Sequence, residues 1–153
     1  MSLVEQLNGV HNIFLDTAPV IYFAERHPLF ASPLQQLFEM LDGGKLTAVV
    51  SPITLAECLV LPYKLGRSDV VQIFTNLLMN SDNIWLCPLD ETTAAKAAEL
   101  RARYNLTLTD AFQVALAIQT GCETFLTNDL ALKRVREIRV MVISEQPVGT
   151  TPK

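Results

Sequence analysis

Residues 106–129 read LTLTDAFQVALAIQTGCETFLTND and decide the fold of this 153-residue chain. An apolar segment with helical spacing is followed, after a glycine, by a short apolar strand. Asp110 stands at the start of the helix and Asp129 at the end of the strand. From residue 111 to residue 118 only Gln113 is polar, so we expect a helix that is buried on nearly all sides and turns only Gln113 to the solvent. An unpaired charge beside buried segments is costly, so the two acids require an explanation.

Strand-like and helix-like segments alternate along the rest of the chain. Short β-branched or apolar runs predict strands at residues 13–15, 46–50, 84–89, 124–127 and 140–143. Helical spacing and capping residues predict helices at residues 20–24, 33–42, 53–61, 70–78, 91–104, 111–118 and 130–136, with Pro62 and Gly66 limiting the third of these. This alternation predicts an α/β/α sandwich around a central, mainly parallel sheet of about five strands.

The bulk composition is that of a single globular domain. Hydrophobic residues make up 50% of the chain and charged residues 18%, which excludes a disordered chain. We expect an N-terminal extension over residues 1–12, the α/β domain over residues 13–144 and a flexible tail over residues 145–153. No apolar run reaches the roughly 20 residues that a membrane span needs, and the N-terminus shows no secretion signal.

The cysteines and the net charge narrow the class of protein further. Three cysteines, far apart and without a C-x-x-C pair, argue against a disulfide framework and a zinc site and favour a reducing cytoplasm. The net charge of −4 counts mildly against a nucleic-acid binder, which normally has a basic surplus. Acids gathered in a metal site would offset this objection, because bound cations cancel their charge.

Two further acids stand in positions like those of Asp110 and Asp129. Asp16 follows the first predicted strand, and Glu57 lies about one turn into the helix after the second. Right-handed crossovers bring the carboxyl ends of parallel strands to one edge of the sheet, where ligands bind near the point of strand-order reversal. We therefore expect all four carboxylates at that edge.

Four carboxylates at one edge repel one another strongly. At separations of roughly 6 Å and an effective dielectric constant of ~20, each pair repels by about 3 kcal/mol. Helix N-termini relieve only about 0.3–1 kcal/mol each, so protons or hard cations must join the cluster. Oxygen ligands select Mg²⁺ or Mn²⁺, and the chemistry that suits such a site is hydrolysis of a phosphodiester by a metal-activated water.

Each acid also has an ordinary structural interpretation. Asp16 and Asp129 are typical helix caps, and Asp110 is typical of a capping box with Thr107. Glu57, in the middle of a mostly apolar helix, is typical of a buried salt bridge. Only the common position of the four residues at one edge of the sheet favours a functional site.

The segments around these acids resemble the four acidic motifs of the PIN-domain nucleases, most closely those of VapC-type toxin ribonucleases. The motifs are FLDTAPVIYF at residues 14–23, SPITLAECL at 51–59, LTLTDAFQVALA at 106–117 and FLTND at 125–129. The resemblance implies a Mg²⁺-dependent endoribonuclease in which Asp16, Glu57, Asp110 and Asp129 bind the metal and position water. It also implies a PIN-like domain over residues 13–144, a neighbouring antitoxin protein that blocks the site, and a homodimer.

Residues beside the acids extend this hypothesis. Thr17, Thr127 and Asn128 are candidates to hydrogen-bond the metal-binding carboxylates. Five cations are candidates for contacts with RNA phosphates, although ordinary solvated helix faces are the more common explanation for such residues: Arg101, Arg103, Lys133, Arg134 and Arg136.

Two other functions fit parts of the pattern. A metal-dependent phosphatase or phosphotransferase also places acids at strand ends, but its usual D-x-D motif is absent because Thr17 and Ala18 follow Asp16. A catalytically inactive PIN-like module that binds RNA or protein is the second alternative. Loss of catalysis usually removes one of the acids, and all four are present here.

Overall fold

The computed structural model describes residues 1–146 and has a five-stranded, entirely parallel sheet at its centre. The strands are β1 (Asn12–Leu15), β2 (Thr47–Val50), β3 (Ile84–Leu86), β4 (Thr124–Thr127) and β5 (Arg139–Val142). Their order across the sheet is β3-β2-β1-β4-β5. The predicted α/β fold with a parallel sheet is confirmed.

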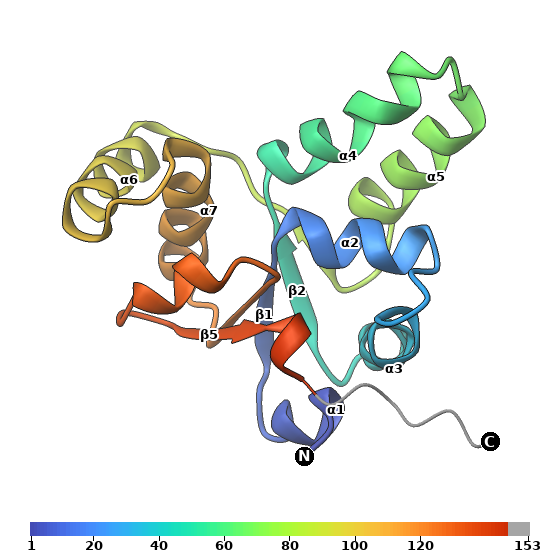
Figure 1. Cartoon of the computed structure of the whole chain (residues 1–153), viewed down its shortest axis with the longest axis horizontal. Helices are drawn as coiled ribbons and strands as arrows, with labels where there is room; N and C mark the ends of the chain where they lie inside the picture. The colour runs from blue at the N-terminus through green and yellow to red at the C-terminus, as the bar shows by residue number, and fades with distance from the viewer. Residues whose placement is uncertain (147–153) are drawn as a thin grey trace.

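Helices cover both faces of the sheet (Figure 1). One face carries α2 (Thr17–Ala24), α3 (Ala31–Asp42), α4 (Pro52–Lys64) and α5 (Ser68–Met79), and the other carries α6 (Glu91–Tyr104) and α7 (Leu108–Gln119). Three short helical segments complete the described chain: α1 (Leu3–Gln6), η1 (Leu130–Arg134) and η2 (Ile143–Glu145). No helix within residues 1–146 is long and apolar enough to span a bilayer.

Alternating side chains of the strands form two hydrophobic cores, one beneath each helical layer. In β1, Ile13 and Leu15 pack into the core beneath α2–α5, whereas Phe14 packs into the core beneath α6 and α7. Phe14 stacks on Phe125 of β4 with ring centroids 5.0 Å apart. Both faces of the sheet are covered, so its strands are apolar on both sides.

Helix α7 is buried as expected, but the direction of Gln113 was predicted wrongly. Ala111, Val114, Ala115 and Ala117 have no exposed surface, which lets α7 lie close against the sheet and α6. Gln113 is only 2% exposed. The amide points inward because it finds hydrogen-bond partners there, as the site shows below.

Two predicted helix ends were also wrong. Helix α4 continues through the buried Pro62 to Lys64 instead of ending before the proline. Pro62 lies in the last turns, and the backbone bond from Leu65 N–H to Leu61 O (3.0 Å) still closes the helix. The helix predicted over residues 130–136 is a 3₁₀ segment that ends at Arg134. The chain becomes extended there because Val135 turns inward to the core.

The structure describes the N-terminal end of the chain completely and the C-terminal end in part. Where we expected an N-terminal extension over residues 1–12, α1 packs against α3 and buries Leu3 and Leu7 completely. Of the tail expected over residues 145–153, Glu145 ends η2, and residues 147–153 lie outside the described part of the chain.

Candidate functional site

The candidate site lies where the order of the strands reverses. From β1 the chain proceeds to β2 and β3 on one side, and β4 and β5 then extend the sheet on the other side. Leu15 of β1 is level with Leu126 of β4, so Asp16 and Thr127 come next to each other at the carboxyl edge. The N–H of Asp16 donates to the carbonyl of Leu126 at 2.9 Å and continues the ladder. In an open parallel sheet this is where ligands bind.

Asp16 is held by three uncharged donors. It caps α2, and its Oδ1 accepts from the N–H of Thr17 at 2.9 Å and from Nε2 of Gln113 at 3.3 Å. Its Oδ2 accepts from the hydroxyl of Thr127 at 2.8 Å. Burial raises the pKa of Asp16, and these hydrogen bonds oppose the rise. The cap interpretation is therefore correct, but it accounts for only one of the three bonds.

Glu57 joins Asp16 through Thr17. The exposed Glu57 side chain of α4 accepts a hydrogen bond at Oε1 from the hydroxyl of Thr17 at 2.7 Å. Thr17 thus donates its N–H to one acid and its O–H to the next. Within residues 1–146 Glu57 has no ion pair, so the alternative of a buried salt bridge is wrong.

Asp110 has the clearest electrostatic signature of the four acids. It lies in the first turn of α7, where its N–H donates to the capping hydroxyl of Thr107 at 3.2 Å. Burial and the negative charge of Asp16 raise the pKa of Asp110 to about 6, with smaller contributions from Asp129 and Glu57. Each of the other three carboxylates therefore lies near enough for Asp110 to sense its charge.

Asp129 is the outermost of the four acids. Its exposed side chain caps η1, and Oδ1 accepts from the N–H of Ala131 at 2.9 Å, as the cap interpretation predicts. Among residues 1–146 no three His, Cys, Asp or Glu side chains lie close enough together to hold one metal ion. The structure thus places the four acids at one edge, which we call the acidic edge, without drawing their carboxylates into a closed cluster.

The three predicted neighbours of the acids behave differently from one another. Thr17 and Thr127 both donate to the acids, but the hydroxyl of Thr127 goes to Asp16 across the sheet and not to the nearby Asp129 carboxylate. Asn128 contacts no acid: Nδ2 donates to the hydroxyl of Tyr22 at 2.9 Å, and Oδ1 accepts from the N–H of Ser144 at 3.2 Å. It joins α2 to the segment after β5.

Sequence reasoning missed Gln113 as a contact of Asp16. The available signal was a single amide three residues after Asp110, in a helix that is otherwise apolar. A polar side chain on the buried face of a helix needs a partner, and here that partner is part of the acidic edge.

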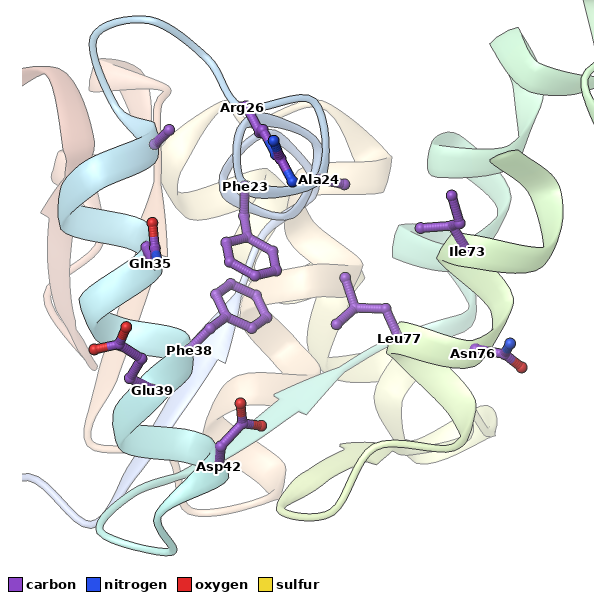
Figure 2. A pocket seen from close by; sticks show the side chains of 11 residues that line it. Phe23, Ala24, Arg26, Gln35, Phe38, Glu39, Asp42, Ile73, Asn76 and Leu77 are labelled. Carbon is purple, nitrogen blue, oxygen red and sulfur yellow. The ribbon is translucent and has the colours of Figure 1, made fainter. Parts of the chain in front are cut away.

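Two cavities lie away from the acidic edge. One, of about 930 Å³, opens between α2, α3 and α5 (Figure 2). Phe23 and Phe38 stack in it with ring centroids 3.8 Å apart, Leu77 points toward them, and charged side chains such as Glu39 and Asp42 line its margin. A second cavity, of about 350 Å³, lies between the end of α2 and the α4–α5 hairpin. Both cavities are lined by apolar side chains together with charged ones.

Replacing Asp110 tests the charge repulsion at the acidic edge. In the folded protein its pKa is about 6, above the ordinary value of 3.8, so ionisation of Asp110 costs stability as pH rises from about 4 to about 6. Asp110→Asn should therefore raise the free energy of unfolding of the EDTA-treated protein by about 1 kcal/mol at pH 8, after allowance for solvent screening. The gain should be much smaller near pH 4, where wild-type Asp110 is protonated in the folded state and about half protonated in the unfolded state.

Urea unfolding at pH 4 and pH 8 measures this effect. Asp82→Asn, at the opposite edge of the sheet, is the matched control and should show no such pH-dependent gain. A metal-free Asp110→Asn protein that is less stable than wild type at pH 8 would contradict the electrostatic account.

Several solved structures share this fold. DNA-bound VapBC from Salmonella typhimurium matches with a TM-score of 0.69 and 18% identity, over 87% of this chain and 98% of that one. A toxin–antitoxin complex from Klebsiella pneumoniae has a TM-score of 0.65 and 18% identity, over 86% and 97%. VapC20 of Mycobacterium tuberculosis, described as a sarcin–ricin loop cleaving toxin, has a TM-score of 0.64 and 15% identity, over 83% and 98%. At these identities the likeness is one of fold.

The sequence itself assigns the family. No curated protein matches the chain. The family model of the PIN domain, however, matches residues 13–138, which run from β1 to the residue before β5 and include all four acids. The chain belongs to the PIN-domain family.

Proposed function

We propose that this protein is a Mg²⁺- or Mn²⁺-dependent endoribonuclease of the cytoplasm and the toxin of a toxin–antitoxin pair. The observation that carries the proposal is the hydrogen-bonded arrangement at the carboxyl edge of the sheet, where Thr17 donates to both Asp16 and Glu57 and Thr127 donates to Asp16. Burial and the negative charges of Asp16, Asp129 and Glu57 raise the pKa of Asp110 there to about 6. Carboxylates whose negative charges oppose one another's ionisation, at the edge of a parallel sheet where ligands bind, favour the binding of a cation.

The donors at the acidic edge fit a hard divalent cation. Asp16, Glu57, Asp110 and Asp129 offer oxygen atoms only, and Mg²⁺ is commonly held by one or two carboxylates together with waters and substrate phosphate oxygens. A bound ion of this kind supplies a water of lowered pKa and positive charge for the reacting phosphate. Glu57 and Asp129 are exposed, so their side chains are free to turn toward such an ion.

The protein's own groups would prepare this site. Thr17, Thr127 and Gln113 hold the Asp16 carboxylate in a fixed orientation. Asp16 and Asp110 both have raised pKa values, so protons compete with metal for them. Activity should therefore fall as the pH drops below about 6, where Asp110 becomes protonated.

Cleavage of a mixed single-stranded RNA pool tests the proposal directly. Wild-type protein should cut RNA in Mg²⁺ or Mn²⁺ and not in EDTA. Asp16→Asn should reduce the rate more than about 100-fold, because it removes a metal-binding charge that sits at the centre of the hydrogen-bonded site. Asp82→Asn is the control for loss of one surface acid and should retain wild-type activity.

The other outcomes separate the alternatives. Cutting that persists in EDTA, or in Asp16→Asn at the wild-type rate, would refute the proposed mechanism. RNA binding without cutting, and without any effect of metal on the melting temperature, would favour an inactive binding module. Release of phosphate from p-nitrophenyl phosphate would favour the phosphatase.

Four of the five candidate phosphate-binding cations fall into two groups. Arg103 pairs with Glu99 at 2.6 Å and Glu137 at 2.7 Å, and Lys133 pairs with Glu145 at 2.7 Å. By contrast, Arg101 donates to the carbonyl of Leu106 at 2.6 Å and Arg134 to that of Tyr104 at 3.2 Å. Arg101 and Arg134 keep their net charge beside the loop that leads into α7 and Asp110, which supports a role in holding the RNA backbone.

Paired substitutions test this division. Arg101→Gln with Arg134→Gln should weaken RNA binding and reduce the slope of log K against log salt by about 1.4, because two phosphate contacts are lost. Arg103→Gln with Lys133→Gln removes the same formal charge but should have a much smaller effect. Filter binding at several salt concentrations, in the Asp16→Asn background, gives both slopes. Equal slopes for the two double variants would rule out the assignment.

The cavity between α2, α3 and α5 supports a protein partner. Its apolar floor and charged margin suit an inserted peptide segment with apolar anchors, as expected of an antitoxin (Figure 2). One structural neighbour is itself a toxin–antitoxin complex. For the homodimer we propose the α4–α5 hairpin, where Val60, Leu61, Tyr63 and Leu65 are each more than half exposed.

Two exposed side chains of α5 provide a matched test of the partner surface. Ile73 is 56% exposed and lines both cavities, whereas Met79 is 55% exposed and lines neither. Ile73→Lys should weaken binding of the protein encoded beside this chain at least about tenfold, because it introduces a charge among apolar anchors. Met79→Lys should bind normally. Titration calorimetry with the two variants measures the difference, and equal affinities would show that the partner binds elsewhere.

A further inference from the structure

Gln113 is a buried amide with a partner for each of its polar atoms. Its Nε2 donates to the hydroxyl oxygen of Thr54 at 2.8 Å and to Oδ1 of Asp16 at 3.3 Å. Its Oε1 accepts a hydrogen bond from the hydroxyl of Ser51. A single side chain from α7 therefore contacts both the end of β1 and the start of α4.

The contacts on α4 determine where that helix begins. The Ser51 hydroxyl caps α4 by accepting from the N–H groups of Ile53 at 3.1 Å and Thr54 at 3.2 Å. Ser51 and Thr54 have no exposed surface, so water does not compete for these bonds. Because its single proton goes to Gln113, the Ser51 hydroxyl is oriented to accept both N–H groups.

These bonds close a circuit around the acidic edge. Gln113 joins Asp16 to the first turn of α4, and the next turn of α4 carries Glu57. Glu57 accepts from Thr17, whose N–H returns to Asp16. Gln113 itself lies one turn after Asp110 on the same helix. Gln113 is therefore connected to three of the acids: to Asp16 by a hydrogen bond, to Glu57 through the first turn of α4, and to Asp110 through α7.

An amide is the group that this position requires. It donates to Asp16 and Thr54 while it accepts from Ser51, and it does so without adding charge. A glutamate of the same length would retain the acceptor, but it would lose both donors and place a second negative charge against Asp16. A methionine would fill the space and make none of the three bonds.

We propose that Gln113 is a positioning residue that orients the Asp16 carboxylate and fixes α4 against α7, so that the acidic edge is arranged to bind a divalent cation. The last clause rests on the proposed function, whereas the orientation of Asp16 does not. Residues that hydrogen-bond to metal-binding side chains typically contribute 10–100-fold in metal affinity.

Gln113→Met is tested beside a matched variant on the same helix. Gln119, at the other end of α7, accepts from the hydroxyl of Thr93 at 2.5 Å and joins α7 to α6 far from the acids. Gln119→Met thus removes an interhelical bond of the same kind. Gln113→Leu, which is also uncharged, is the second variant at the site, in case the methionine variant does not fold. Urea unfolding in EDTA establishes which variants are folded.

The first measurement is the Mn²⁺ concentration that gives half of the maximal rise in melting temperature. Gln113→Met and Gln113→Leu should each need at least about tenfold more Mn²⁺ than wild type, and Gln119→Met should stay within about twofold. Folded Gln113 variants with the wild-type midpoint would overturn the proposal. The kcat/KM for RNA should fall by a similar factor, and raised Mn²⁺ should recover it in Gln113→Met.

The second measurement separates this proposal from the proposed function. Crystal structures of the metal-free wild type and Gln113→Met show the orientation of the Asp16 carboxylate without reference to any ion. Loss of its bonds to Thr17 and Thr127 in the variant supports the positioning role, and an unmoved carboxylate overturns it. If wild type neither binds Mn²⁺ nor cuts RNA, the nuclease proposal fails, and this structural comparison still decides the role of Gln113.

Discussion

The structure depends on a carboxylate that is hydrogen-bonded but not neutralised. Asp16 lies at the end of the central strand β1 and accepts hydrogen bonds from a backbone amide, a hydroxyl and a side-chain amide, none of them charged. Within residues 1–146 no Lys or Arg pairs with it. These hydrogen bonds hold the buried carboxylate in one orientation, but they do not balance its negative charge.

The other three acids differ from one another in burial and in hydrogen bonding. Asp110 is partly buried, and among its charged neighbours Asp16 raises its pKa most. Glu57 and Asp129 are exposed. Glu57 accepts a hydrogen bond from Thr17, and Asp129 accepts one from the N–H of Ala131 as the cap of η1. Asp16 is held in place by hydrogen bonds, ionisation of Asp110 is electrostatically costly, and the outer pair is exposed to solvent. This division is suited to a cation that arrives with its own waters and a substrate phosphate.

The sequence predicted the features that follow from local patterns. Apolar runs and helical spacing located the five strands and the main helices, and parallel topology then placed four acids at one edge. The direction of Gln113 could not be predicted in this way, because polarity alone points it to water and its partners Ser51 and Thr54 lie about sixty residues away. Local patterns also did not predict that α4 continues past Pro62 or that η1 ends at Arg134. Nor did they predict the partner of Asn128, which is next to Asp129 in sequence but donates a hydrogen bond to Tyr22.

The position of β4 has a consequence for the synthesis of this protein. β1 is made early, but its partner on one side, β4, follows most of the chain, and the bond from Thr127 to Asp16 spans 111 residues. Gln113 also belongs to the last third of the sequence. A nascent chain on the ribosome therefore carries Asp16 long before Thr127 and Gln113, two of its three hydrogen-bond donors, have emerged. The hydrogen-bonded arrangement around Asp16 is therefore completed only when the last third of the chain has folded.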